Sequence, residues 1–145
     1  MVNVTGRTGQ TVSINMLGVG EVIRRLRLSK KEIESSADLG VIKAGGFIEE
    51  EVKESIAGRR AEPKSVTTGQ FANSIEFNKT GNAKGVVAPK LETYPNSNQT
   101  TQNIAVMMEK GTSRIQARRH FGNTKARNMN KVKEIIEKEI KLGVI

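Results

Sequence analysis

The chain contains no cysteine and no tryptophan, and among its 145 residues there are only one histidine, one tyrosine and four phenylalanines. Without cysteine there can be neither a disulfide framework nor a thiolate metal site. A surface that stacks unpaired bases needs several exposed aromatic side chains, so single-strand binding of that kind is disfavoured. The lone histidine, His120, has no second histidine with which to hold a metal ion. The sequence therefore predicts neither a metal nor a cofactor.

Long apolar runs are missing as well. No stretch approaches the roughly 20 residues of a membrane-spanning helix. The residues Met1–Gly6 lack the charged and apolar regions of a signal peptide. We therefore expect a soluble chain with no membrane partner. Its length predicts a single domain, which we place at residues 11–145 after a flexible arm at residues 1–10.

Basic residues are abundant. The formal net charge is +9, and the segment from Lys110 to Lys133 contains eight lysines and arginines and no acid. Such a run is either a solvated face or a surface that meets a polyanion or an acidic protein.

Two amphipathic helices are predicted. One apolar stripe runs through about residues 29–57, where Ser29 and Glu32 form a capping box, and it consists of Ile33, Ala37, Val41, Ala44, Ile48, Val52 and Ile56. A terminal helix at about residues 125–142 is predicted from Met129, Val132, Ile135, Ile136 and Ile140. The pair Gly45–Gly46 predicts a bend or a close contact in the first helix. A short helix is expected at residues 19–26.

Strand signals are shorter. Residues 11–16 alternate apolar and polar side chains, which predicts a half-buried strand, and residues 75–77 and 85–88 flank a turn cluster as in a hairpin. Residues 103–108 could form a strand or a helical turn, followed by Gly111 at the end of a strand. The fold class is therefore α+β, with a small antiparallel or mixed sheet of about four strands packed against the two helices.

Two smaller features complete the fold prediction. Thr68 could cap one helical turn in which Phe71 and Ile75 face inward. The polar segment at residues 89–102 is too long and hydrophilic for an ordinary hairpin loop, so it is either mobile or ordered by a partner.

The sequence favours no enzymatic chemistry. No serine stands in a nucleophile elbow, and the acids of the last helix alternate with lysines, as on a solvated face. Nearby positive charge from Arg119 predicts a neutral His120, which we expect to be a surface or packing residue.

Three segments resemble a known family in their order and spacing. The first is Val12–Gly18, the second is Thr68–Ile75, with Thr68, Gly69, Phe71, Ser74 and Ile75 as motif positions, and the third combines Glu109, Gly111 and Thr112 with Ala117, Arg118 and Phe121. Together they resemble the small neck proteins of long-tailed phages and related proviruses, typified by the gene-ten product of a lambda-like coliphage. The chain departs from the family pattern at Thr67, at Phe71 and at Arg119–His120.

The resemblance implies a structural role in the virion, after assembly in the host cytoplasm. Copies would form a homo-oligomeric ring, with a hexamer expected, between the portal-side connector and the tail-terminator or tube proteins. Such a ring would surround DNA without reading its sequence. We expect some of the basic candidates to face the lumen or an acidic neighbouring ring, and these are Arg114, Arg118, Arg119, Lys125 and Arg127.

Two other functions remain open from the sequence. A free nucleic-acid-binding module would share the basic charge but lacks a recognition-helix motif. A small hydrolase or nuclease would need one acid essential for activity.

Overall fold

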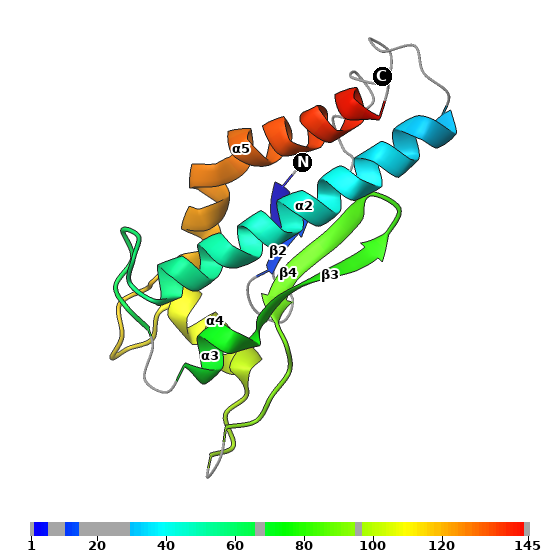
Figure 1. Ribbon diagram of the computed structural model, residues 1–145. Helices are drawn as coiled ribbons and strands as arrows, with labels where there is room; N and C mark the ends of the chain where they lie inside the picture. Colours follow the sequence, from blue (N-terminus) through cyan, green and yellow to red (C-terminus); the bar gives the residue numbers. More distant parts are fainter. Residues whose placement is uncertain (1, 6–10, 15–29, 66–68, 95–96, 144–145) are drawn as a thin grey trace.

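The computed structural model describes residues 2–5, 11–14, 30–65, 69–94 and 97–143 (Figure 1). In chain order the elements are β1 (Val2–Thr5), β2 (Thr11–Ile14), α2 (Lys30–Ile56), α3 (Gln70–Ser74), β3 (Ile75–Gly81), β4 (Lys84–Pro89), α4 (Thr101–Lys110) and α5 (His120–Leu142). The α+β class with a long helix and a C-terminal helix is confirmed. The short helix expected at residues 19–26 and the cap at Ser29 lie outside the described residues.

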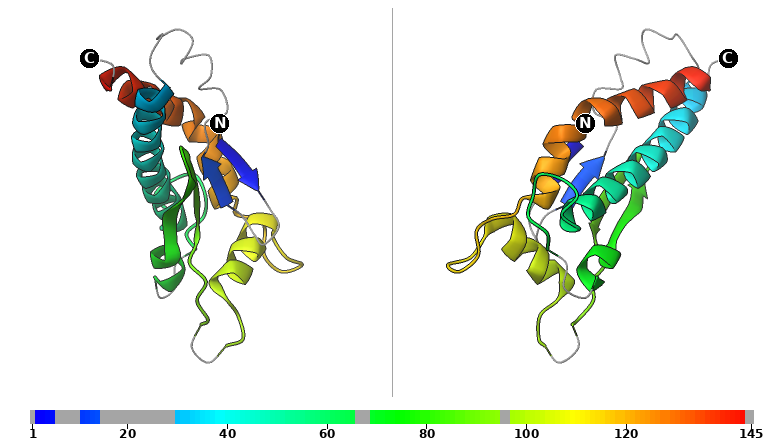
Figure 2. Two further views of the ribbon diagram at one scale, coloured as in Figure 1. Left: turned by 90° about the vertical axis from the view of Figure 1, so that its right-hand side faces the viewer. Right: turned by 60° about the vertical axis from the view of Figure 1, so that its left-hand side comes forward.

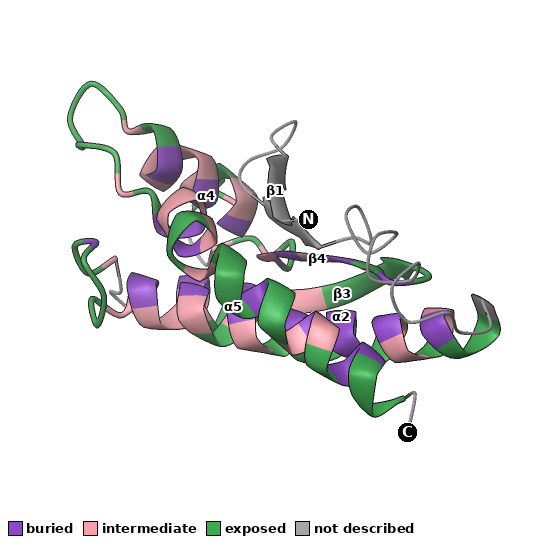
Figure 3. Cartoon of the chain, turned by 90° about the horizontal axis from the view of Figure 1, so that it is seen from above, coloured by how far each residue is buried: buried purple, intermediate pink, exposed green. Residues whose placement is uncertain are grey.

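The strands form one antiparallel sheet in the order β1-β2-β4-β3. Helices α2 and α5 lie side by side on one side of this sheet (Figure 3), with α2 over β3 and β4 and α5 reaching β1 and β2. Residues 2–5 pair with residues 11–14 as strand β1, which the sequence did not predict. None of the helices in the described part of the chain is long and apolar enough to cross a membrane.

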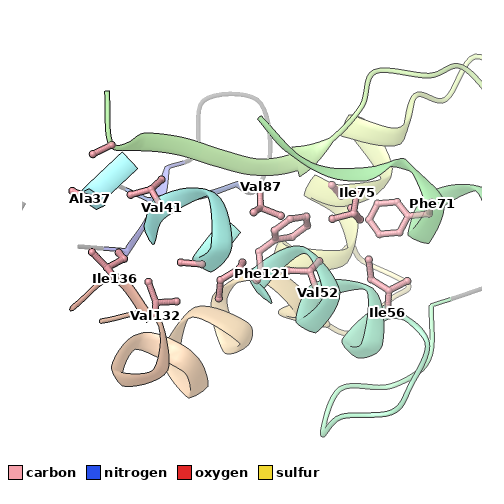
Figure 4. Packing of buried hydrophobic residues seen from close by; sticks show 14 of the residues in the cluster. Ala37, Val41, Val52, Ile56, Phe71, Ile75, Val87, Phe121, Val132 and Ile136 are labelled. Carbon is pink, nitrogen blue, oxygen red and sulfur yellow. The ribbon is translucent and has the colours of Figure 1, made fainter. Parts of the chain in front are cut away.

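The core lies between α2, α5 and the hairpin (Figure 4). All seven residues of the predicted stripe on α2 are completely buried. Val132, Ile136 and Ile140 of α5 are buried against them, but Met129 is 47% exposed and was wrongly predicted to face inward. Phe121 is also in the core, which explains why α5 begins at His120, five residues earlier than the sequence suggested.

Of the two adjacent glycines in α2, Gly45 makes a close contact with the sheet. A Cβ atom at Gly45 would lie 2.3 Å from the ring of Phe77 on β3, and one at Gly85 on β4 would lie 2.1 Å from the same ring. The phenyl ring therefore occupies space that is open only because both neighbours lack side chains. A Cβ at Gly46 would meet nothing within 4 Å. Of the two predicted possibilities, the close contact applies to Gly45.

Two carboxylates of α2 hold the hairpin on the helix. Glu49 Oε2 accepts a hydrogen bond of 2.9 Å from the backbone N–H of Phe77, which satisfies a donor of the edge strand β3. Asp38 accepts from the backbone N–H of Ala83 in the hairpin turn at 2.9 Å and from Lys79. The pKa of Asp38 lies below its ordinary value, chiefly because its carboxylate accepts the hydrogen bond from Lys79.

The expected hairpin is present, and its turn consists of Asn82 and Ala83 alone because β3 continues to Gly81. Residues 103–108 belong to helix α4, where Thr100 caps the first turn by accepting a hydrogen bond from the N–H of Asn103 at 3.1 Å. Thr101 stabilises the base of the preceding polar loop, because its hydroxyl donates a hydrogen bond to the carbonyl of Lys90 and accepts one from the N–H of Glu92. The base of this loop is thus held by its own chain.

The two adjacent glycines of α2 provide a matched test of this packing. Gly45→Ala should destabilise the protein by about 1–3 kcal/mol, since the new methyl group overlaps a ring that Gly85 holds from the other side. Gly46→Ala should instead stabilise it by roughly 0.5–1 kcal/mol through helix propensity. Urea unfolding of both variants measures the difference, and equal effects would contradict the packing described.

Candidate functional site: a basic loop anchored on a buried polar network

The segment at residues 111–119, here called the basic loop, connects α4 to α5 and projects from the body of the molecule (Figure 2). It begins at Gly111, which has a φ of 75°. A Cβ there would lie 2.8 Å from the backbone nitrogen of Ala117 and 2.9 Å from the carbonyl oxygen of Ile115. Only glycine fits this position. The sequence predicted that Gly111 ends a strand, but it ends helix α4.

Thr112 closes the tip of the basic loop. Its N–H donates to the carbonyl of Ile115 at 2.8 Å, and its hydroxyl accepts from the N–H groups of Arg114 at 3.2 Å and Ile115 at 3.0 Å. The side chains of Arg114 and Ile115 are exposed on this turn. The basic loop therefore presents a cation and an apolar side chain on a hydrogen-bonded frame.

Glu109 joins the two ends of the basic loop. This residue of α4 is 7% exposed and accepts hydrogen bonds from the backbone N–H of Phe121 and, at 3.4 Å, of Gly122. Both donors belong to the first turn of α5, where N–H groups have no partner inside the helix and a carboxylate is favoured. Burial raises the pKa of Glu109, and the two N–H groups and Arg119 lower it only in part.

A buried polar network lies under the C-terminal side of the basic loop. His120 Nδ1 is 2.8 Å from Ser55 Oγ, and Nε2 is 2.8 Å from Ser65 Oγ. Ser55 Oγ donates to Glu62 Oε2 at 2.6 Å, and the other carboxylate oxygen accepts from Arg127. We call these five residues the polar network. It ties the end of α2 and the segment after it to the start of α5.

The positions of the protons in the polar network follow from which atoms can donate and which can only accept a hydrogen bond. Burial raises the pKa of Glu62, but hydrogen bonds from Arg127 and Ser55 outweigh it and bring the pKa to about 2, so the carboxylate only accepts. Ser55 must then give its proton to Glu62 and accept from Nδ1–H of His120. Nε2 is left to accept from the hydroxyl of Ser65. This proton order satisfies every polar atom of the chain of bonds.

This arrangement resembles a serine–histidine pair, but its electrostatics favour a structural role. His120 is 1% exposed, and burial lowers its pKa to about 4, with the positive charges of Arg118 and Arg127 acting in the same direction. A general base works best with a pKa near the working pH. The prediction of a neutral His120 is confirmed, although burial and not the neighbouring arginines is the main cause.

Two of the five basic candidates are engaged within the chain. Arg127 is paired with Glu62. Arg118 donates to the carbonyl of Lys64 at 2.9 Å and to Ser65 Oγ at 3.2 Å. These two residues anchor the segment after α2 to the start of α5, and they are not free to meet a polyanion.

The other three candidates point outward. Arg114 and Arg119 are exposed and Lys125 is half-buried, and none of them forms an ion pair with another described residue. The guanidinium of Arg119 lies over the backbone of Gly122, close enough to lower the pKa of Glu109. The basic loop and the first turns of α5 therefore carry three cations that form no ion pair with a described residue.

Five motif positions of the second and third segments are buried. Phe71, Ser74 and Ile75 are buried, and Gly69 has a φ of 82° just before α3. Glu109 and Phe121 meet at the start of α5, whereas Thr112 and Ala117 shape the exposed loop. Thr68 lies outside the described residues. The motifs thus coincide with positions that hold this fold together.

Sequence reasoning missed Ser55, Glu62 and Ser65. Ser55 could have been noticed, because it falls at helical spacing between the buried Val52 and Ile56 and is itself completely buried. Glu62 and Ser65 follow Gly58 in an irregular segment, and nothing in their spacing pointed to residues 120 and 127.

The described residues contain no group of three or more histidines or acids that could hold a metal ion. A shallow hollow of about 300 Å³ lies near the other end of α5, lined by Glu134, Glu137, Lys138, Lys141 and Leu142. It lies beyond the polar network along α5, since Glu134 follows Arg127 by seven residues, or about 10 Å of helix. Comparison of the chain with protein-family models, with curated proteins and with solved structures found no match.

Replacement of Glu109 tests how the basic loop is anchored. Glu109→Ala leaves the buried N–H of Phe121 and the partly buried N–H of Gly122 without an acceptor and should destabilise the protein by about 1–3 kcal/mol. Glu109→Gln keeps an acceptor oxygen and should cost less. Amide hydrogen exchange at residues 121 and 122 should accelerate most in the alanine variant; unchanged exchange there would contradict the anchoring role.

His120 is the one histidine of the chain, so its titration can be followed as a single imidazole NMR signal. We expect no titration near pH 6.5 and an inflection near pH 4. Because the folded-state pKa lies below the ordinary value of 6.5, the neutral form stabilises the fold fully above pH 6.5. This contribution, on the order of 3 kcal/mol, is lost as the pH falls from 6.5 to about 4.

The raised pKa of Glu109 acts with the opposite sign, since its penalty grows as the pH rises above 4.5. The difference in melting temperature between the wild type and His120→Gln therefore isolates the histidine. A His120 signal that titrates at its ordinary pKa would show that the imidazole is open to water.

Proposed function

We propose that this chain is a non-enzymatic structural protein of a phage neck, where a ring of copies surrounds the DNA passage between the connector and the tail. The observation that carries the proposal is the unpaired positive charge of the basic loop and the start of α5, in a segment with eight basic residues and no acid. Lys and Arg attract phosphates without reading bases, which suits a lining that DNA must pass.

The resemblance of the three sequence segments supports the same function. The second and third segments supply the packing of α3 and the join between α4 and α5, so a shared motif set is expected to accompany a shared fold. The ring, with a hexamer expected, the neighbouring connector and tail-terminator or tube proteins, and the location in the virion remain parts of this proposal.

A free nucleic-acid-binding protein is the alternative that the same basic surface favours. Both functions predict salt-dependent DNA binding, so binding alone does not separate them. A ring-sized species in solution or co-purification with tails favours the neck protein, whereas a monomer that binds DNA and is absent from particles favours the alternative.

Charge reversal tests the proposed role of the basic surface. The variant Arg114→Glu/Lys125→Glu should impair the joining of heads to tails and reduce the slope of log K against log salt by about 1 for each of the two residues that contacts phosphate. The control Lys84→Glu/Lys138→Glu changes the net charge equally at other exposed positions and should leave joining intact.

Both charge variants should unfold within about 0.5 kcal/mol of the wild type, because the replaced side chains form no ion pair with described residues. Arg127→Glu should instead be strongly destabilising, since it places a second acid beside the buried Glu62. Normal joining by the Arg114→Glu/Lys125→Glu variant would refute the proposed role.

A further inference from the structure

Helix α2 carries exposed apolar side chains on the face opposite to its core stripe. Leu39 is 45% exposed and Ile42 is 42% exposed, and the exposed Gly46 and Glu50 continue the same face at spacings of four residues. A helix of this kind ordinarily presents charged residues there. We call these four residues the outer stripe. Gly46 has no side chain, and a Cβ there would meet nothing within 4 Å. The outer stripe therefore has an uncovered stretch of backbone between Ile42 and Glu50, which we call the bare site.

The outer stripe also ends in a free negative charge. Helix α2 contains seven acids and four lysines, and its acids Asp38, Glu49, Glu51 and Glu54 are paired with cations of the same chain. Glu50 is exposed and forms no ion pair with any described residue. It lies one helical turn, about 6 Å, from Gly46.

The tip of the basic loop has the complementary features. Ile115 is 37% exposed and stands next to Arg114, an exposed cation without an ion pair in the described part of the chain. The turn around Thr112 holds the backbone of both residues before any contact is made, which limits the backbone entropy lost on binding. Since the tip and the outer stripe are both exposed, they do not cover each other within one copy.

We propose that the tip of the basic loop in one copy docks on the outer stripe of a second copy. Ile115 packs on Gly46 beside Ile42, and Arg114 pairs with Glu50, which leaves Arg119 and Lys125 as the candidates for phosphate contact in the ring. The two surfaces are different, so the contact is head-to-tail and repeats from copy to copy until it closes. This inference rests on the proposed function, because it assigns the contact between neighbouring subunits of the ring.

The energetics fit a repeated contact better than an isolated pair. Burial of one isoleucine contributes about 1.5–3 kcal/mol, and an exposed ion pair adds up to about 1 kcal/mol. One such contact falls short of the roughly 1,000 Å² of a stable interface. In a closed ring every copy forms two such contacts, one through its loop tip and one through its outer stripe. The fraction of chains in rings should therefore rise steeply with protein concentration.

Because the chain has no cysteine, disulfide trapping reports this contact without interference. A variant with Ile42→Cys is mixed with a variant that carries Ile115→Cys and an added affinity tag, so that the mixed disulfide and the two homodisulfides differ in mass and can be separated. We expect the mixed disulfide to exceed either homodisulfide at least several-fold. The control Asn98→Cys, exposed in another loop, should form no more than random products.

Two further variants separate docking from folding. Gly46→Met fills the bare site while adding a good helix former, so it should keep the fold and reduce trapping. Arg114→Glu and Glu50→Arg should each weaken the concentration-dependent association about tenfold, or 1.4 kcal/mol, and the double variant should restore it.

Trapping no better than with Asn98→Cys, or homodisulfides of Ile42→Cys that exceed the mixed product, would overturn the proposed contact. The trapping result and the neck function can nevertheless be tested separately. Mixed trapping combined with complete particles that lack the chain would leave the contact standing and reject the neck function, while failure of trapping with normal incorporation into necks would do the reverse.

Discussion

The hydrogen bonds between the Glu109 carboxylate and the first N–H groups of α5 are the constraint on which the exposed surface depends. One side chain closes the connection between α4 and α5, and Phe121 enters the core at the same point. The basic loop therefore leaves from and returns to fixed positions. The polar network adds a second restraint, because His120 at the start of α5 binds serines from both sides of Gly58. A loop held in this way has a backbone restrained at both ends and at its turn.

The helices could be predicted because each buries a single continuous stripe. The seven inward positions of α2 follow helical spacing without interruption, and burial of all seven is the physical reason for the pattern. Residues 103–108 were ambiguous because a short apolar run fits a strand or a helix equally well. The side chain of Thr100 caps the first turn and so favours the helix over a strand. Strand β1 was missed because a four-residue strand depends on its partner β2 more than on its own sequence.

The candidate site was predictable in composition but not in connectivity. The acid-free run of basic residues is visible in the sequence, and so is the exposed loop that begins at Gly111. The division of the arginines into anchors and free cations depends on Glu62, which lies 65 residues before Arg127. Likewise, the serines that bind His120 come from 65 and 55 residues away. Contacts between residues so far apart in the sequence form only when the chain has folded, so the spacing of residues within one segment cannot predict them.

The ring of Phe77 lies between two positions without side chains, Gly45 on α2 and Gly85 on β4. A slip of β3 by one residue along β4 would turn this ring to the opposite side of the sheet and bring a polar neighbour, Glu76 or Asn78, against the helix. The glycines thus select one alignment of the hairpin. Since β4 also pairs with β2, and β2 with β1, a phenylalanine and two glycines align the far strands with a helix that they scarcely touch.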